Sequence, residues 1–294
     1  MIQILHRFNP EFSLIFSVSP MQTRVVEFDG RSWSECLIDR TCEMTVNGVS
    51  PADCAVWLCG GGGGGGGGCQ GSPNEGGGGG GGGRCGAYTN IRLASGSIVI
   101  GAGGDGGLGS TVAATANKGQ DGGVTRLSVT GQPDLTASGG NAGTRTWGGN
   151  GGSGGGQSYY SGSTDYVGLG AGATTIPFGD GVNWARLCAG GGGASPMINS
   201  SKQYLGGAGG SNGGNGKAPS FGGNWTGTTV GGEGGATGGG NGGNAAYSSP
   251  QPGGDATYYG GGGGGGSVST KSGTVAQNGG AGYKGCVIIR VPTA

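Results

Sequence analysis

The chain has little of what most enzymes and nucleic-acid-binding proteins depend on. Its only histidine is His6, and charged residues make up 10% of the 294 residues, with 15 basic and 15 acidic side chains that cancel. A neutral chain has no basic surface to hold a phosphate backbone, so we expect no nucleic-acid partner. No apolar run reaches the roughly 18 residues that a membrane-spanning helix needs, so we also expect no membrane span.

Catalytic and metal-binding motifs are scarce as well. A Ser-His-Asp or Cys-His site would have to use His6, close to the terminus, and no zinc-protease or phosphate-loop motif occurs. The eight cysteines include no C-x-x-C pair, which favours structural disulfides or buried thiols over a metal site. A scattered pair of carboxylates, as glycosidases use, is the one enzymatic alternative that stays open. We therefore expect a non-enzyme without cofactor or metal.

One stretch has the spacing of a dinucleotide-binding loop. The apolar run Ile98–Ile100 is followed by Gly101, Gly103 and Gly106, which gives G-x-G-x-x-G. That fold requires a helix next and then a second parallel strand. Residues 108–118 are too short and too rich in glycine, threonine and serine to form the helix. We attribute the match to the abundance of glycine.

Glycine is what the chain has in excess, with 85 residues. Residues 1–59 contain only Gly30 and Gly48, and every other glycine follows Cys59. This step in composition predicts an N-terminal β segment over residues 1–54 and a glycine-rich domain over residues 55–294. Collagen is excluded because there is no Gly-X-Y register and there are only 11 prolines. Disorder is disfavoured because the hydrophobic residues, 32% of the chain, fall in strand-like runs.

Several of these runs predict short β-strands, and none has a helical period. The expected strands are Thr23–Phe28, Glu43–Val46, Ala55–Leu58, Ile98–Ile100, Val124–Val129 and Cys286–Val291. The dipeptides Asp29-Gly30 and Asn47-Gly48 follow the first two and predict hairpin turns. Because Ala55–Leu58 and Cys286–Val291 flank the glycine region, we expect these two strands to meet at its base.

The first twenty residues have a short apolar stretch but no cleavage site typical of a signal peptide. We expect a retained segment. It is either a strand that docks on a partner or a terminal strand of its own domain.

Glycine forms three unbroken tracts, Gly60–Gly68, Gly76–Gly83 and Gly260–Gly266, and recurs elsewhere in Gly-Gly-X triplets. A helix of the polyproline-II type has three residues per turn and no internal hydrogen bonds, so its N–H and C=O groups must bond to neighbouring helices. Only glycine lets backbones approach closely enough, and the side chain of each triplet would then line an edge. We expect a mostly irregular and β fold, with stacked polyglycine-II helices framed by a few short strands. The scaffold positions are Gly60, Gly64, Gly68, Gly76, Gly83, Gly260 and Gly266.

Four motifs follow one another along the glycine-rich part. They are the apolar strand that enters glycine at Val56–Gly60, then Ser97–Gly104, Gly119–Thr125 and the closing Gly279–Arg290. This order resembles the glycine-rich domains of bacteriophage tail-fibre and adhesin proteins, over about residues 55–294. The resemblance implies layers of polyglycine-II helices whose connecting loops recognise the host surface. It also implies a location on the virion surface and attachment to other virion proteins through the N-terminal segment, as a monomer or a homo-oligomer.

Aromatic residues set among serine, asparagine, threonine and glycine are the candidates for receptor binding. Rigid aromatic rings with small polar neighbours are typical of antibody paratopes and also suit stacking on sugars, so the receptor would be a glycan or a membrane protein. The alternative is that these aromatics cap the glycine scaffold. The candidates are Tyr159, Tyr160, Tyr166, Trp184, Tyr204, Trp225, Tyr247, Tyr258 and Tyr259.

Two other functions stay open at this point. One is a structural virion or extracellular scaffold that binds nothing specific. The other is an ice-binding protein, which would need a flat and regular threonine or alanine face.

Overall fold

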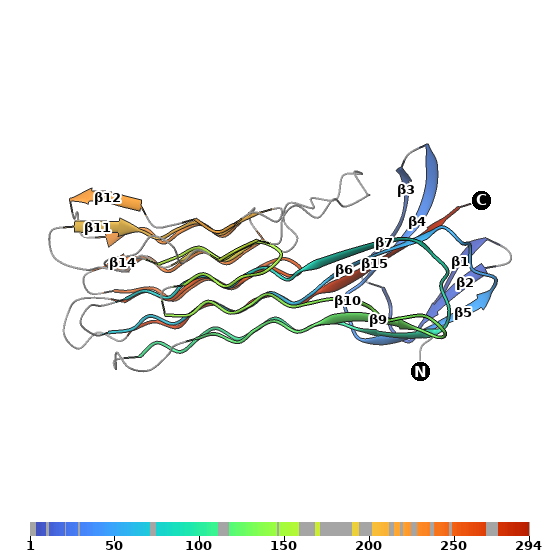
Figure 1. Cartoon of the computed structure of the whole chain (residues 1–294), viewed down its shortest axis with the longest axis horizontal. Coiled ribbons are helices and arrows are strands. Elements are labelled where there is room, and N and C mark those ends of the chain that lie inside the picture. Colours follow the sequence, from blue (N-terminus) through green and yellow to red (C-terminus); the bar gives the residue numbers. More distant parts are fainter. Residues whose placement is uncertain are drawn as a thin grey trace.

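The structure, a computed structural model, is elongated: β-strands gather at one end, and glycine-rich segments run side by side along the long axis to the other end (Figure 1). It describes residues 4–9, 12–20, 22–28, 30–70, 75–110, 118–145, 147–158, 168–170, 190–193, 202–211, 215–217, 220–224, 228–235, 238–246, 249–268 and 276–293. Within these ranges the fold is β and irregular, without an α-helix.

Two antiparallel sheets form the strand end. The first has six strands in the order β1 (Ile4–Asn9), β2 (Phe12–Phe16), β5 (Cys42–Gly48), β8 (Gly96–Val99), β9 (Thr125–Val129) and β10 (Leu135–Ala137). The second has five, in the order β3 (Gln22–Phe28), β4 (Arg31–Ile38), β15 (Cys286–Pro292), β6 (Cys54–Cys59) and β7 (Cys85–Ile91). Two small ribbons, β11 (Lys202–Leu205) with β12 (Ser220–Asn224) and β13 (Thr228–Thr229) with β14 (Ala245–Ala246), lie at the far end (Figure 1).

The two large sheets pack face to face as a sandwich. One cluster of buried apolar side chains draws on both, with Leu14 of β2 and Ile98 of β8 from the first sheet and Val56 of β6 and Ile289 of β15 from the second. Side chains alternate between the faces of a strand, so each strand sends every second residue into this core. We call this unit the sandwich.

The central strands β6 and β15 are buried on both faces. They pair in antiparallel register, with Trp57 opposite Ile288, which confirms the expectation that the strands flanking the glycine region meet at its base. Their outer face carries a second apolar cluster that includes Trp57, Ile288 and Tyr259. An apolar strand without alternation is what burial on both faces requires.

The expected division at residue 54 does not separate two packed units. Strand β4 pairs with β15, and β5 pairs with β8, so residues 1–54 share both sheets with the remainder of the chain. Strands β1 and β2 belong to the six-stranded sheet, which answers the question left open for the first twenty residues: they are terminal strands of their own domain.

Of the two expected hairpins, one forms. Strand β3 pairs with β4 around Gly30, whose φ is 69°. The prediction of a hairpin at Asn47-Gly48 was wrong. Strand β5 ends at Gly48 and pairs with β2 and β8 rather than with β6, the strand that follows it. Its partners lie upstream and far downstream, and a local dipeptide does not carry that information.

The hydrogen bonds of the glycine tracts are neither those of an α-helix nor those of a strand ladder. Instead, the bonding partners repeat every three residues. Along Gly60–Gly68, consecutive amides donate in turn to three neighbouring segments. These bonds are Gly61 to Gly123, Gly62 to Tyr283 and Gly63 to Gly81, then Gly64 to Gln120, Gly65 to Gly280 and Gly66 to Gly78, all at 2.8–2.9 Å.

Carbonyls of the same tract accept bonds from three further segments. The donors are Gly104 and Gly107, Gly140 and Gly143, and Gly263 and Gly266. Tract 60–68 is therefore surrounded by segments 76–84, 101–110, 119–123, 138–144, 260–266 and 277–283. We call this array of laterally bonded segments, beyond Cys59, the glycine lattice.

Glycine is needed in the lattice for space rather than for an unusual backbone angle. Among the glycines that the structure describes, only Gly30, Gly48, Gly131 and Gly260 have positive φ. By contrast, a Cβ at Gly64 would fall well under 3.0 Å from the carbonyl oxygen of Asp105, and the same holds against backbone oxygens along all three tracts. In segment 101–110 the side chains face solvent: Ala102, Asp105 and Leu108 are exposed at intervals of three.

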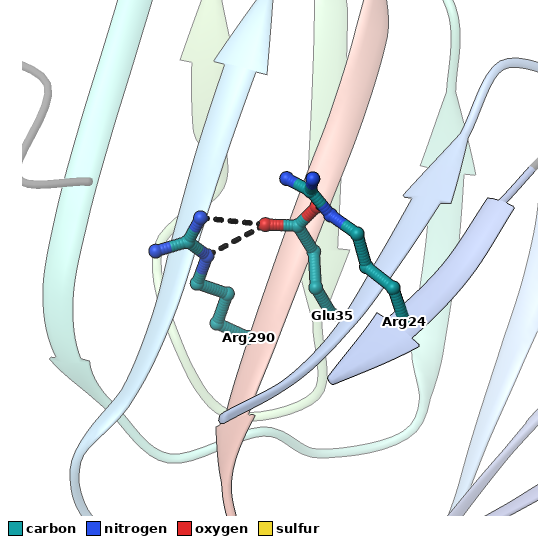
Figure 2. Close-up of polar contacts among 3 residues, drawn as sticks. All are labelled: Arg24, Glu35 and Arg290. Atoms are coloured by element: carbon teal, nitrogen blue, oxygen red, sulfur yellow. Dashed lines mark hydrogen bonds and ion pairs between the residues drawn. The ribbon is translucent and has the colours of Figure 1, made fainter. Parts of the chain in front are cut away.

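A buried ionic contact lies on the outer face of the five-stranded sheet (Figure 2). Glu35 of β4 stands directly opposite Arg24 of β3 and Arg290 of β15. One carboxylate oxygen accepts from Arg24 Nε at 2.7 Å, and the other accepts from Arg290 Nε and a terminal nitrogen of Arg290 at 2.7 Å. Arg290 is fully buried and Glu35 is 5% exposed, so water screens this contact poorly.

We predict that Gly64→Val destabilises the protein by about 3 kcal/mol or more, because the side chain would separate tract 60–68 from the segment that holds Asp105 and break lateral hydrogen bonds. The matched control is Ala102→Val, whose side chain is exposed in the neighbouring segment and should change stability by less than about 0.5 kcal/mol. Chemical denaturation measures both. Equal stability of the two variants would contradict an interior position for Gly64.

We predict that Glu35→Gln lowers stability by about 3–5 kcal/mol, because it removes the carboxylate that both guanidinium groups contact inside the protein. Asp53→Asn is the control, since Asp53 pairs with Arg31 at the surface and such pairs contribute at most about 1 kcal/mol. Urea unfolding of the two variants provides the comparison. A loss at Glu35 no larger than that at Asp53 would show that the buried contact is energetically neutral.

Candidate functional site

The structure places few of the nine aromatic candidates. Tyr159, Tyr160, Tyr166, Trp184, Trp225 and Tyr247 lie outside the described residues. Tyr204 lies in β11, in the ribbon at the far end of the molecule (Figure 1). Tyr258 and Tyr259 precede tract 260–266 and lie at the opposite end of the lattice, against the sandwich.

Tyr259 is a buried residue of the junction between sandwich and lattice. It is 8% exposed, and its ring makes edge contacts with Tyr258 and Tyr283 at centroid distances of 5.4 and 5.7 Å. Its hydroxyl donates to Asp39 Oδ2 at 3.3 Å, and Lys284 Nζ donates to the same oxygen at 2.7 Å. Burial, followed by the charge of Asp39, raises the pKa of the Tyr259 phenol, so it stays a neutral donor.

This junction links three parts of the chain. Asp39 follows β4, Lys284 precedes β15, and Tyr259 precedes a glycine tract, so one carboxylate holds the sheet and two lattice segments together. Tyr259 therefore caps the lattice, which is the alternative role that the sequence left open for the aromatic residues. It is not part of the proposed recognition surface.

The seven scaffold glycines all lie in the lattice. A Cβ at Gly60, Gly64, Gly68, Gly83 or Gly266 would come within 3.0 Å of backbone atoms of a neighbouring segment. Gly76 is buried at the start of its tract. Gly260 differs, because its φ of 68° turns the chain after Tyr259 into its tract.

A polar groove of about 450 Å³ opens on the side of the lattice. Its side chains come from Glu233, Asn241, Asp255 and Thr257, with glycines between them. Two of these side chains are held by lattice amides: Asn241 Oδ1 accepts from Gly234 N at 2.8 Å, and Asp255 Oδ1 accepts from Ala281 N at 2.7 Å.

The groove offers mainly hydrogen-bond acceptors, which suit hydroxyl or ammonium groups of a ligand. Sequence reasoning did not single it out. Glu233 and Asp255 are isolated exposed residues among glycines, and only the packing of residues 233–234, 239–241 and 254–257 brings them to one groove.

The described cysteines are thiols, not disulfides: Cys36, Cys42, Cys54, Cys59, Cys69, Cys85 and Cys286. Burial raises the pKa of Cys36 to about 12 and that of Cys42 and Cys54 to about 11. Such thiols are protonated at neutral pH and are poor nucleophiles. In the sandwich core, cysteine serves as a small apolar side chain.

The described part of the chain has neither a metal-binding cluster nor a membrane-spanning helix. No group of three or more histidine, cysteine, aspartate or glutamate side chains there is placed to hold a metal ion. Nor does that part contain a helix that is long and apolar enough to cross a membrane.

The chain matches a known protein family, and that family's description agrees with the architecture. No curated protein matches the chain. A family model described as a glycine-rich domain matches residues 41–292, from the residue before β5 to the end of β15. The match covers most of the chain, including the strands of the sandwich that frame the lattice. The protein thus belongs to the glycine-rich domain family.

Proposed function

We propose that the glycine lattice is a bundle of polyglycine-II helices. Three observations support this assignment: the repeat of three in the hydrogen bonds, the six segments around tract 60–68, and the negative φ of the tract glycines other than Gly260. A helix with three residues per turn presents its amides in three lateral directions, which is what such a repeat requires.

The test of this assignment is a crystal structure in which the backbone angles of Gly60–Gly68 and Gly76–Gly83 are measured. We predict clustering near a φ of about −75° and a ψ of about +145°. Angles spread over the β region, or a hydrogen-bond repeat of two, would make these tracts strands instead.

We further propose that the protein is a non-enzymatic adhesin of a bacteriophage tail fibre or tail tip, exposed on the virion surface. It would recognise a host-cell glycan or membrane protein. The observation that carries this proposal is the separation between the two ends of the molecule. The sandwich holds both β1 and the C-terminal strand β15, whereas the ribbon β11–β12, which contains Tyr204, emerges at the far end of the lattice (Figure 1).

This separation suits attachment at one end and recognition at the other. Attachment to other virion proteins would involve the sandwich, where Val25 and Val49 are 66% and 77% exposed. Deleting residues 1–20 is not a suitable test of attachment, because Phe12, Leu14 and Phe16 of β2 are buried in the sandwich core and their loss would disrupt it.

We predict that replacing Tyr159, Tyr160 and Tyr166 together by serine leaves the melting temperature within about 2 °C of the wild type and reduces binding to host cells at least tenfold. The sequence sets these three tyrosines in a polar stretch between glycine-rich segments, and residues of such a stretch can change without altering the lattice. Val49→Ser is the control, since it removes an exposed apolar side chain at the sandwich end and should leave cell binding unchanged. Labelled purified protein and host cells provide the assay.

The alternative is a structural virion or extracellular scaffold without a specific ligand. Wild-type protein that binds no cells, or a triple tyrosine variant that binds as well as the wild type, would favour that alternative over the adhesin.

A further inference from the structure

Three cysteines lie side by side where glycine segments join the five-stranded sheet. Cys59 ends β6, Cys85 begins β7 and Cys286 begins β15. Cys59 stands opposite Cys85 on one side and opposite Cys286 on the other. All three side chains belong to the outer face of the sheet, in or against the cluster around Tyr259.

The hydrogen bonds distinguish the two cross-strand pairs. Gly60 N donates to Arg84 O at 2.9 Å, one residue beyond the Cys59–Cys85 pair. In an antiparallel ladder, this bond makes Cys59 and Cys85 a non-hydrogen-bonded pair, whose Cα atoms lie about 4.5 Å apart with the side chains close together. Disulfides span Cα separations of about 4.4–6.8 Å, so this pair can be bridged with little movement of the backbone.

The Cys59–Cys286 pair has the other geometry. The polar groups of successive residues in a central strand point alternately to its two neighbours, so those of Cys59 point to β15 and make Cys59 and Cys286 a hydrogen-bonded pair. Such pairs are about 5.5 Å apart at Cα, a separation that also lies within the disulfide range, but their side chains lie farther from each other. Cys286 is also fully buried, whereas Cys85 is half-buried and more open to a soluble oxidant.

We propose that Cys59 and Cys85 form a disulfide when the protein meets an oxidising environment, and that this bond closes the base of the lattice. The loop it closes contains residues 60–84 and thus the first two glycine tracts. The inference rests on the sheet register and does not depend on the proposed adhesin function.

The chemistry needs a small-molecule disulfide as oxidant. The Cys85 thiolate attacks one of its sulfurs, which forms a mixed disulfide and releases one thiolate of the oxidant. The Cys59 thiolate then attacks the Cys85 sulfur, forms the Cys59–Cys85 bond and releases the second thiolate. Two protein thiols lose two protons and two electrons, and the oxidant is reduced to two thiols.

The expected consequence is a redox-dependent stability. Closing a loop of this size restricts the unfolded chain, so the oxidised protein should melt several degrees above the reduced protein. The lattice geometry would change little, because the pair is already in register.

The experiment compares full-length protein equilibrated in reduced and in oxidised glutathione. Remaining thiols are alkylated under denaturing conditions, and the protein is digested with trypsin without reduction. Cleavage after Arg40, Arg84 and Arg92 isolates Cys85 in peptide 85–92, so the bond should appear as this peptide joined to peptide 41–84. Fragmentation of the joined peptides identifies the partner of Cys85 among the cysteines of peptide 41–84, and melting curves are recorded for both states.

We predict the joined peptides and the higher melting temperature in oxidised wild type, their loss in Cys59→Ser and Cys85→Ser, and their retention in Cys286→Ser, the matched control. Peptide 85–92 that stays fully alkylated after oxidation would overturn the proposal, as would a bond from Cys85 to a cysteine other than Cys59. A Cys59–Cys286 bond would overturn it too. The wild-type peptide map decides the question even if a variant fails to fold.

Discussion

The structure depends on one constraint, which is that the amides of a glycine tract find no partner within the tract. Each N–H and C=O must therefore bond to a neighbouring segment, because every such group left buried without a partner costs about 1–3 kcal/mol. The repeat of three spreads these bonds over several neighbours, so a single tract such as Gly60–Gly68 is satisfied only inside a full ring of segments. Ordering so much glycine is entropically costly, and the density of lateral bonds is what offsets it.

The sandwich supplies the frame in which this ring begins. Strands β6, β7 and β15 lie side by side in one sheet, and each continues directly into a lattice segment, so the sheet fixes the spacing and direction of three segments at their base. The carboxylate of Asp39 binds Tyr259 and Lys284, and it thereby holds the segments that adjoin these two residues against this base. The β core and the glycine lattice thus share strands and buried contacts.

The sequence allowed the parts with strong local patterns to be predicted. The strands around Val56 and Ile289 were recognisable because unbroken apolar runs indicate burial on both faces, and the tracts indicated lateral bonding because glycine leaves few alternatives. The features that could not be predicted depend on contacts between residues far apart in the sequence. The partners of β5 are β2 and β8, which the turn dipeptide at Gly48 could not reveal. For Tyr259 the sequence left display and capping both open, and it could not show that Asp39, 220 residues earlier, gives its hydroxyl a buried acceptor. The groove with Glu233 and Asp255 likewise exists only through packing of separate segments.

The central position of tract 60–68 also determines the order in which the molecule can be completed. Gly62 donates to Tyr283 and Gly65 donates to Gly280, so the first of the three tracts to be synthesised finds these partners only after the other two tracts have been made. Until those residues leave the ribosome, the innermost tract has an incomplete ring, and its amides bond to water. Contacts of such long sequence separation close slowly, because the loop entropy is lost before the contacts form. The tract at the centre of the lattice is therefore the first to be made and among the last to be fully bonded.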